Sequence, residues 1–476
     1  MKTNFTTPHS NKEVTVKPER DTIGPGGLGA KTAGLRKHQP LLERCGFGYL
    51  PQVAITPGFF SDFLRRAGVS HEAPEEAPRA IRSTDFSKTE LEAIRASVQP
   101  FSELYAAVRS DECTAAGTGL GASGFVLADN SEEIIGRVAG IVKGILASDF
   151  SRDMVAFKRR VGLPMKQTPG VLVMPVDTTP IPSAGIHTTL FHVNAVNDFA
   201  RGDALIQMGI GIGGANRKFA RVVLLGDLDT SHPRFLSDYA ETAYGFSNGA
   251  MKQLKEGVDE SDLADLELEF GGLTQSLGAD AISDLRHGFH ALKANGNPPL
   301  YMELAYNGYH WLVIQCSNVI QKHVTRPEET GKKILEVKPE PMQLSPRFGL
   351  NVSGRGIIES GKAVLVRATT DLATLAAINK ATKDYVLVLD MDLRALSDHF
   401  SFADYSNAAA IISTQETKRP AISHFNGALR EAGIAVLAGD VDEDFLNGLK
   451  SGEISSRDLL VYANDELEEG FVLDRG

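Results

Sequence analysis

A histidine at an expected helix start is the side chain in this sequence best suited to group transfer. His424 stands in TKRPAISHFNGALREAGIAVLAGD, before a helical stretch that Gly433 can end ahead of an apolar strand. A neutral imidazole, with a pKa near ~6.5, is a nucleophile around pH 7. The amides of a helix N-terminus attract a phosphoryl anion, and Arg419 can add a charge-assisted contact. The same local pattern also fits a surface or capping histidine.

A glycine-rich segment near the start of the chain could receive phosphates. In GPGGLGAK, from Gly24 to Lys31, the glycines let backbone amides approach an anion, and Lys31 supplies a mobile positive charge. The segment does not match the P-loop pattern, because no glycine immediately precedes the lysine. A glycine turn before a helix with a solvated lysine remains the alternative.

Three further polar residues are spread along the chain. Arg109 ends a short apolar strand in AAVRS, and Glu303 and Gln315 stand in YMELAYNGYHWLVIQCSN. A turn at Tyr306–Tyr309 would fold that segment into a hairpin and bring Glu303 and Gln315 together. A carboxylate there could hold Mg²⁺ against ATP phosphates, because hard cations prefer oxygen ligands. A partly exposed hairpin with scattered polar residues is the alternative interpretation.

The order and spacing of these segments resemble one known family. GAKTAGL, ITPGFF, VRSDECTAAGTGLGASG and MELAYNGYHWLVIQCS resemble, in that order, motifs of the ATP-grasp domain of pyruvate phosphate dikinase and phosphoenolpyruvate synthase. AISHFNGALREAGIAVLAG resembles the phosphohistidine element of the swivelling domain in these enzymes, and SGRGIIESGKAV resembles its opening turn. The resemblance covers nearly the whole chain from Ile23 onward, although only position carries it between about residues 217 and 297.

The resemblance implies roles for the residues that match. Lys31 and Arg109 would bind ATP phosphates, Glu303 would ligate Mg²⁺, and Gln315 would lie near the metal and the phosphates. Two positions depart from the family. Tyr301 replaces an acidic residue two positions before the glutamate, and Ser317 replaces an arginine two positions after the glutamine. Around His424, the usual Gly-Gly before the histidine is Arg-Pro, and the usual Ala-Ala after it is Phe-Asn.

The resemblance also implies a reaction, namely a dikinase-type phosphotransferase. The β-phosphoryl group of Mg-ATP would pass to His424 and then to an acceptor, with release of AMP and phosphate. The match ends before the carboxy-terminal barrel that binds pyruvate in complete dikinases. We therefore expect the acceptor to be a small molecule or a site on a separate subunit. Two alternatives stay open: an ATP-binding sensor or scaffold without turnover, and a direct ATP-dependent ligase, which would release ADP.

The elements that must position these residues alternate between strands and helices. Short apolar runs predict strands at AAVRS, GFVLAD, GVLVMPV, ARVVLLGD and YHWLVIQCS, while Ser131 is expected to cap a helix. Residues 235–273 are rich in helix formers, and DAISDLRHGFHALKA predicts another helix. Five more apolar runs follow, namely GKAVLVRA, YVLVLDMD, AAAIISTQ, IAVLAGD and DLLVYAND, interleaved with helical stretches such as DLATLAAINKA.

The predicted fold is α/β and α+β multidomain, because 476 residues exceed a single core. We expect a flexible leader at 1–22, an ATP-grasp domain at 23–323, a Pro-, Lys- and Glu-rich linker at 324–349, and a small α/β swivelling phosphohistidine domain at 350–476. GIGIGG at Gly209–Gly214 lacks the GxGxxG spacing of a dinucleotide site. Asp390 and Asp392 are interpreted as structural residues at a strand end.

Composition excludes several other classes of protein. A net charge of -11 argues against nucleic-acid binding, which needs clustered Lys and Arg. We expect no membrane partner, because no stretch of about 18 apolar residues occurs. Three widely spaced cysteines form no zinc or disulfide framework, which favours a reducing cytoplasm. A homodimer is compatible with the sequence, which does not determine the oligomeric state.

Overall fold

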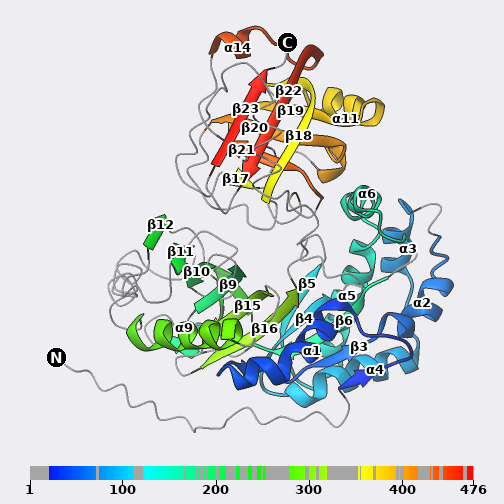
Figure 1. Cartoon of the computed structure of the whole chain (residues 1–476). Coiled ribbons are helices and arrows are strands. Elements are labelled where there is room, and N and C mark those ends of the chain that lie inside the picture. Colours follow the sequence, from blue (N-terminus) through cyan, green and yellow to red (C-terminus); the bar gives the residue numbers. More distant parts are fainter. Residues whose placement is uncertain are drawn as a thin grey trace.

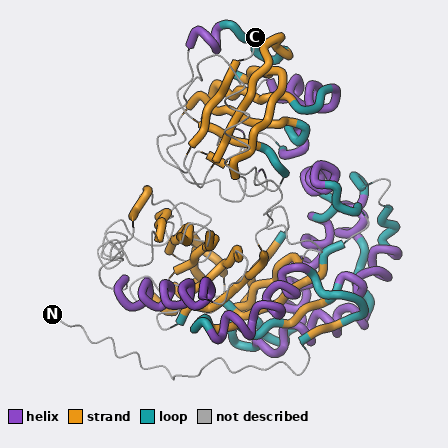
Figure 2. The backbone as a smooth tube through the Cα atoms, viewed as in Figure 1, coloured by secondary structure: helices purple, strands orange, loops and turns teal. Residues whose placement is uncertain are grey.

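The structure, a computed structural model, is a mixed α/β protein with four sheets (Figures 1 and 2). It describes residues 21–70, 74–111, 122–165, 168–176, 179–181, 186–188, 191–198, 203–210, 221–225, 234–237, 244–247, 250–253, 278–294, 300–306, 310–318, 352–353, 355–367, 371–392, 396, 401–415, 429, 432–438, 443–464 and 469–474. Three sheets are built from residues before 319 and the fourth from residues after 351. We call these the N-terminal and C-terminal regions.

The first sheet of the N-terminal region has five strands in the order β1-β3-β6-β4-β5. Its strands are β1 (Thr22–Ile23), β3 (Val53–Ile55), β6 (Gly170–Pro175), β4 (Tyr105–Asp111) and β5 (Ser123–Leu127). Only β1 and β3 are parallel. The strands at AAVRS, GFVLAD and GVLVMPV that the sequence predicts are therefore confirmed.

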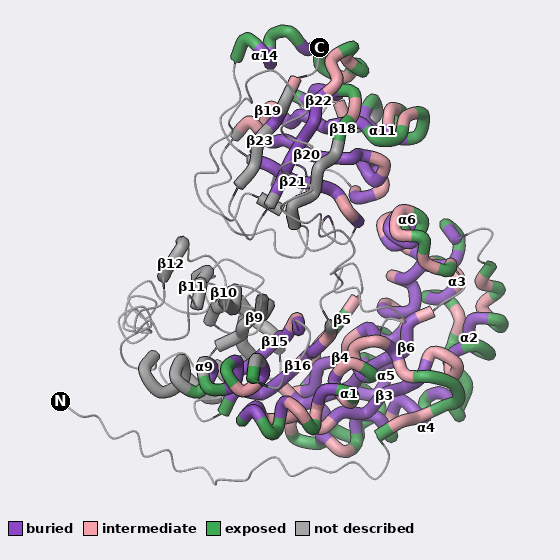
Figure 3. Tube along the Cα trace, in the orientation of Figure 1, coloured by how far each residue is buried: buried purple, intermediate pink, exposed green. Residues whose placement is uncertain are grey.

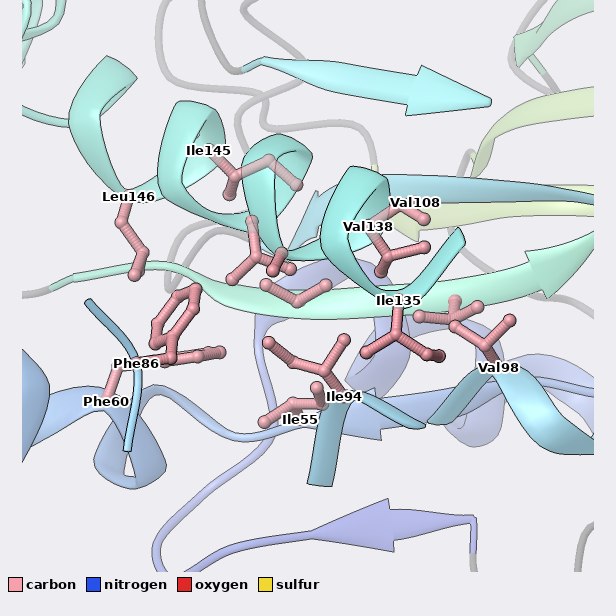
Figure 4. Packing of buried hydrophobic residues seen from close by; sticks show 14 of the residues in the cluster. Ile55, Phe60, Phe86, Ile94, Val98, Val108, Ile135, Val138, Ile145 and Leu146 are labelled. Atoms are coloured by element: carbon pink, nitrogen blue, oxygen red, sulfur yellow. The ribbon is translucent and has the colours of Figure 1, made fainter. Parts of the chain in front are cut away.

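Helices and short 3-10 turns surround this sheet. They are α1 (Ala30–Arg44), η1 (Pro57–Phe60), α2 (Ser61–Arg66), α3 (Ala77–Ser83), α4 (Lys88–Val98), η2 (Gln99–Phe101), α5 (Glu132–Ser148) and α6 (Arg152–Val161). Figure 4 shows Ile135 and Val138 of α5 packed with Val108 of β4 and Ile55 of β3 in one apolar cluster. Burial of this cluster, whose members are mostly inaccessible to water, is the main source of stability for this part of the chain.

Two of these helices begin with side-chain caps that the sequence encodes locally. Ser131 accepts the N–H of Ile134 at 3.2 Å, which confirms the predicted start of α5. At α4, Ser87 accepts the N–H of Glu90 at 3.4 Å, and the Glu90 carboxylate accepts the N–H of Ser87 at 2.7 Å. This reciprocal capping box satisfies two donors that the first turn leaves without a helical partner.

A second sheet of seven strands has the order β12-β11-β10-β9-β15-β16-β2. Its strands are β12 (Arg234–Ser237), β11 (Arg221–Leu225), β10 (Asp203–Ile210), β9 (Phe191–Asp198), β15 (Leu300–Tyr306), β16 (Trp311–Asn318) and β2 (Gly48–Tyr49). Helix α9 (Gly278–Ala294), which the sequence predicts, and α1 contribute to the apolar cluster under this sheet. That cluster also contains Ala107 of β4 and Leu172 of β6, so α1 is packed with both sheets.

The third sheet contains a hairpin that corrects one sequence prediction. Its order is β14-β13-β8-β7, with β7 (Thr179–Ile181), β8 (Ile186–Thr188), β13 (Tyr244–Ser247) and β14 (Ala250–Gln253). The sequence predicts helix from residue 235 onward, and this prediction is wrong at β12, β13 and β14, which are strands. Ser247 pairs with Ala250, and the two residues between them are Asn-Gly. Asn-Gly favours the tight turn of a two-residue hairpin, and this local signal outweighs helix propensity.

The C-terminal region forms one sheet of seven strands, in the order β17-β21-β20-β19-β18-β22-β23. Its elements are β17 (Val352–Ser353), β18 (Arg355–Val366), α11 (Leu372–Ala381), β19 (Tyr385–Asp392), η5 (Phe402–Asp404), β20 (Ala408–Gln415), β21 (Ala435–Ala438), α14 (Glu443–Asn447), β22 (Ile454–Asn464) and β23 (Glu469–Asp474). The central strands β18 to β21 run parallel. All five strands and α11, which the sequence predicts here, are confirmed.

Most buried side chains pack within either the N-terminal or the C-terminal region, and one apolar cluster is shared by both (Figure 3). Two apolar clusters in the C-terminal region contain residues of the sheet β17–β23. One of them also contains Met154 and Phe157 of α6, from the N-terminal region. The predicted linker at 324–349 lies outside the residues that the structure describes. None of the helices in the described part of the chain is long and apolar enough to cross a membrane.

Candidate functional site

The hairpin predicted between Glu303 and Gln315 is present as β15 and β16. The two strands are antiparallel, and Glu303 stands directly opposite Gln315. The next pair is Leu304 with Val313, so Ile314 is an extra residue that forms a β-bulge beside the Glu303–Gln315 pair. A bulge bends its strand and changes the direction of nearby side chains, and bulges are enriched next to functional sites.

Arg109 joins this pair from the neighbouring sheet. Its Nη2 donates to Oε2 of Glu303 at 2.7 Å and to Oε1 of Gln315 at 3.3 Å. The Arg109 side chain is 18% exposed and that of Glu303 is 11% exposed, so the ion pair is largely shielded from water. Three residues that the sequence predicts as site residues, separated by 194 and 206 positions, therefore meet. Charge pairs of this kind interact more strongly than exposed pairs.

Lys31 lies in the first turn of α1, next to the strand that carries Arg109. Its Nζ donates to the backbone oxygen of Ser110 at 2.9 Å. Ser110 directly follows Arg109 in β4, so the two cationic side chains reach the same end of that strand. The structure thus places Lys31 close to β4, while the described contacts place Glu303 and Gln315 around Arg109.

Asp111 is a residue of this site that the sequence analysis missed. Its Oδ1 accepts the N–H of Thr32 at 3.1 Å, and its Oδ2 accepts the Thr32 hydroxyl at 2.6 Å. A carboxylate on β4 therefore caps α1 from 79 residues away. Burial raises the pKa of Asp111, whereas the bonds from Thr32 and the charge of Lys31 act to lower it.

Gly29 explains why the carboxylate can approach the helix so closely. A Cβ atom at Gly29 would lie 2.3 Å from Cγ of Asp111. Every larger residue at this position would displace Asp111 or the helix. Two sequence signals could have found Asp111: its place two residues after Arg109, on the same face of the strand, and the glycine just before α1. We call Lys31, Thr32, Arg109, Asp111, Glu303 and Gln315 the α1 corner.

Tyr301 and Ser317, the two residues that depart from the pattern of the resembled family, also face each other in the hairpin. Tyr301 pairs with Ser317, two positions along from the Glu303–Gln315 pair on each strand. On the other side of β15, Glu303 is in register with Asn194 of β9, and Asn194 is in register with Gln207 of β10. Polar residues therefore occupy one row of register positions across four adjacent strands.

The oxygen atoms of Glu303 and Gln315 suit a hard cation, but they do not form a complete metal site. Among the residues that the structure describes, no cluster of three or more His, Cys, Asp or Glu side chains is arranged to hold a metal ion. Both side chains already accept from Arg109. A magnesium ion would bind here together with oxygen atoms from a ligand, as is usual for this ion beside phosphates.

A thiol near this corner is not a nucleophile. Cys316, next to Gln315, is fully buried, and burial raises the pKa of its thiol to about 12, although Lys37 acts to lower it. The group stays protonated near neutral pH, and a protonated thiol is a poor nucleophile.

In the C-terminal region, His424 and Arg419 lie outside the residues that the structure describes. Gly433 has φ 70°, which suits the predicted helix end before β21. Asp390, at the carboxyl edge of the parallel strands, accepts the Thr414 hydroxyl at 3.1 Å and lies 3.3 Å from Nε of Arg367. These bonds join β18, β19 and β20. The side chain of Asp392 is not among those described.

A scan of the sequence against protein-family models gave no match, and a search of the curated proteins found no relative.

Proposed function

We propose that the protein is an ATP-dependent phosphotransferase of the dikinase type, with an ATP-grasp domain followed by a swivelling phosphohistidine domain. The observation that carries this proposal is the meeting of Arg109 with Glu303 and Gln315 across about 200 residues of sequence. Phosphoryl transfer depends on positioning and on positive charge placed where phosphate oxygens develop charge. The α1 corner supplies both cationic and oxygen-bearing side chains for that purpose.

In the proposed reaction, each residue has a separate task. Lys31 and Arg109 would bind the ATP phosphates, while Glu303 and Gln315 would hold Mg²⁺. Mg²⁺ would neutralise phosphate charge when bound. The imidazole of His424 would attack the β-phosphorus, and the bond from that phosphorus to the oxygen shared with the α-phosphate would break, releasing AMP. Water would then remove the γ-phosphoryl group as phosphate, leaving phosphohistidine.

The acceptor of the phosphohistidine group is left open between a small molecule and a separate acceptor-binding subunit. A phosphate that binds Nη2 of Arg109 would displace Glu303 or Gln315 from it, whereas Nη1 and Nε of the guanidinium are separate donors. A cation beside Glu303 and Gln315 would make this displacement favourable, because it would replace the guanidinium charge. ATP and magnesium are thus expected to bind together.

The geometry also bears on the sensor or scaffold alternative. Tyr301 and Ser317 remove an acidic group and an arginine relative to the family, and they occupy one cross-strand pair. The two lost charges have opposite sign, so the net charge of the site is unchanged. This favours retained ATP binding.

Incubation with β-³²P-labelled ATP and Mg²⁺ tests the proposal. We expect acid-labile label on the protein together with AMP, loss of label in His424→Ala, and loss of both binding and label in Arg109→Ala. Arg66→Ala is a matched control, because Arg66 also forms an ion pair with a buried glutamate, Glu90, and the two residues belong to α2 and α4 rather than to the α1 corner. It should lower stability and leave labelling intact.

The alternative outcomes separate the competing functions. ADP as the product, with no label on the protein because the β-phosphate stays in ADP, would indicate a direct ligase. ATP binding without label or turnover would indicate a sensor or scaffold. No ATP binding by the folded wild-type protein would refute the proposal.

A further inference from the structure

Helix α1 begins at a residue that cannot cap it. Its N-cap residue is Gly29, which has no side chain to accept a hydrogen bond, and its first turn contains no acidic residue. The first N–H groups of a helix lack a helical partner and are usually bound by a neighbouring Ser, Thr, Asp or Asn. The described caps of α4, α5 and α6 follow this rule, with Ser87, Ser131 and Ser151. The start of α1 therefore depends on a partner from another part of the chain.

The carboxylate of Asp111 in β4 is that partner. Its two oxygens accept the N–H and the hydroxyl of Thr32, and both residues are buried, with Asp111 1% exposed and Thr32 0% exposed. Burial raises the pKa of Asp111, and the groups that act to lower it include both Thr32 donors and the backbone N–H of Lys31. A serine has one side-chain oxygen, whereas a carboxylate has two and can hold both donors of Thr32 at once. Asp111 therefore fixes the turn that carries Lys31.

Lys31 is bonded to β4 by its side chain as well. Its Nζ donates to the backbone oxygen of Ser110 at 2.9 Å, and Ser110 lies between Arg109 and Asp111 in the strand. A lysine has a flexible stem, so the place of its ammonium group is defined only where both the backbone and the far end are held. The neighbours Ser110 and Asp111 hold these two ends of Lys31, next to the residue that carries the other cation of the α1 corner.

The space in front of the helix start is filled by the same aspartate. A Cβ atom at Gly29 would lie 2.4 Å from Oδ1 and 2.3 Å from the backbone oxygen of Asp111. The amides at a helix N-terminus commonly bind a phosphate. Here Asp111 stands where that anion would stand, so a phosphate has no room beside the amides that it binds. The side chain of Lys31 is then the group of this turn that can meet a ligand.

We propose that Asp111 is a positioning residue for Lys31: it fixes the first turn of α1 on β4, so that the lysine side chain rather than the helix amides meets a phosphate group. Asp111 itself contacts neither nucleotide nor metal. The part of this inference that concerns phosphate rests on the proposed function, whereas the placement of Lys31 is measurable without a nucleotide.

Competitive acetylation of lysines in the full chain without nucleotide tests the placement. Lys88, whose side chain is 92% exposed, is the internal reference, and mass spectrometry gives the relative rates. In Asp111→Ala we expect Lys31 to react about tenfold faster relative to Lys88 than in the wild type. In Thr32→Val the rise should be about threefold. Thr32→Val keeps the charge of Asp111, so a faster reaction there reports position rather than charge.

Two further variants serve as controls. Thr32→Ser keeps a hydroxyl for Asp111 and should restore most of the wild-type protection of Lys31. Ser131→Ala removes the cap of α5, a different helix of the same region, and should leave the rate of Lys31 unchanged. This pair separates the bond to Asp111 from a general loss of stability.

Equilibrium binding of Mg-ATP to the same variants tests the consequence for phosphate. Thr32 is fully buried and cannot contact the nucleotide, so a weaker affinity in Thr32→Val must act through the position of the turn. We expect the affinity of Thr32→Val to fall about threefold, with most of it restored in Thr32→Ser. Ser131→Ala should bind as the wild type does.

Three results would overturn the inference: unchanged labelling of Lys31 in Asp111→Ala and Thr32→Val, an equal rise in Ser131→Ala, or faster labelling of Lys31 with unchanged affinity for Mg-ATP. Absence of Mg-ATP binding by the wild type would instead refute the proposed function and with it the role toward phosphate, and the labelling rates would still decide the placement of Lys31. If Asp111→Ala fails to fold, the comparison of Thr32→Val with Thr32→Ser decides, because both keep the carboxylate.

Discussion

In the α1 corner an ion pair lies at the centre, whereas the contacts of α6 with the C-terminal region have the apolar side chains of Met154 and Phe157 at their centre. Arg109 and Glu303 are largely shielded from water, while the side chain of Arg152 is mostly exposed. Both places also use bonds between side chains and backbone groups: Lys31 donates to the oxygen of Ser110 in the corner, and Asp153 of α6 accepts the N–H of Ala403. The difference therefore lies in the centre, which is a shielded ion pair in the corner and apolar packing at α6.

The largest expected effect distinguishes the two kinds of charge. Arg109→Ala leaves Glu303 buried without its cation and should lower the free energy of unfolding by about 3–5 kcal/mol. Arg65→Ala breaks an ion pair with Asp62 in which both side chains are mostly exposed, and it should cost under about 1 kcal/mol. Denaturant unfolding of both variants measures the difference. Equal losses would remove the distinction between a shielded and an exposed pair, and a cycle with Glu303→Gln isolates the coupling energy of the shielded pair.

Close backbone packing of α1 gives the second prediction. A Cβ atom at Gly34 would lie 2.2 Å from the backbone oxygen of Cys316 in β16. Gly34→Ala should therefore destabilise the protein by about 1–3 kcal/mol, although alanine favours helix. Gly140→Ala in α5 is the control, because a Cβ atom there would enter open space. It should stabilise by about 0.5–1 kcal/mol, and equal effects at both sites would refute the close packing.

The buried carboxylate of the corner predicts a pH dependence. Burial raises the pKa of Asp111 above its ordinary value of 3.8, so the folded state binds this proton more tightly than the unfolded state. The contribution of Asp111 to stability should therefore fall as the pH rises from 3.8 through the folded-state pKa. Thermal unfolding at a series of pH values measures this. The free energy of unfolding of the wild type, relative to that of Asp111→Asn, should fall as the pH rises from 3.8 through the folded-state pKa. A difference that grows with pH would show that the bonds from Thr32 outweigh burial.

The local cap of α6 gives the smallest effect. Ser151→Ala removes the acceptor for the N–H of Met154 and should cost about 1 kcal/mol. Ser83→Ala, at an exposed residue that ends α3, should change stability by less than about 0.5 kcal/mol. Unfolding of the two variants checks this. No loss in Ser151→Ala would mean that packing alone starts the helix.

Local signals made much of this architecture predictable from the sequence. The apolar runs that became β4, β6, β16 and the strands of the C-terminal sheet are short and continuous, and the start of α5 is encoded in Ser131 itself. The Glu303–Gln315 hairpin was predicted because its turn lies between the two residues. In these cases the signal and the structure are neighbours in sequence, although the Asn-Gly turn between β13 and β14 is an equally local signal that the prediction missed.

The missed features depend on partners that lie far along the chain. Asp111 caps a helix 79 residues away, and α6 completes a core whose other members lie more than 200 residues later. Strands β7 to β10 were not predicted either, and helix propensity was misleading at β13 and β14, where a two-residue turn decides the structure. Propensity is a weak guide wherever tertiary packing or a tight turn competes with it.

Helix α6 and its partners in the C-terminal region lie far apart in sequence, so they are synthesised at different times. Asp153 is made 248 residues before Ser401, and Arg160 is made 272 residues before Ala432. At translation rates of ~5–20 residues per second, these separations correspond to about 12–50 s. During that interval the C-terminal region is not yet made and cannot cover Met154 and Phe157, so the nascent chain exposes an apolar helix face, the kind of surface that makes folding intermediates prone to aggregate.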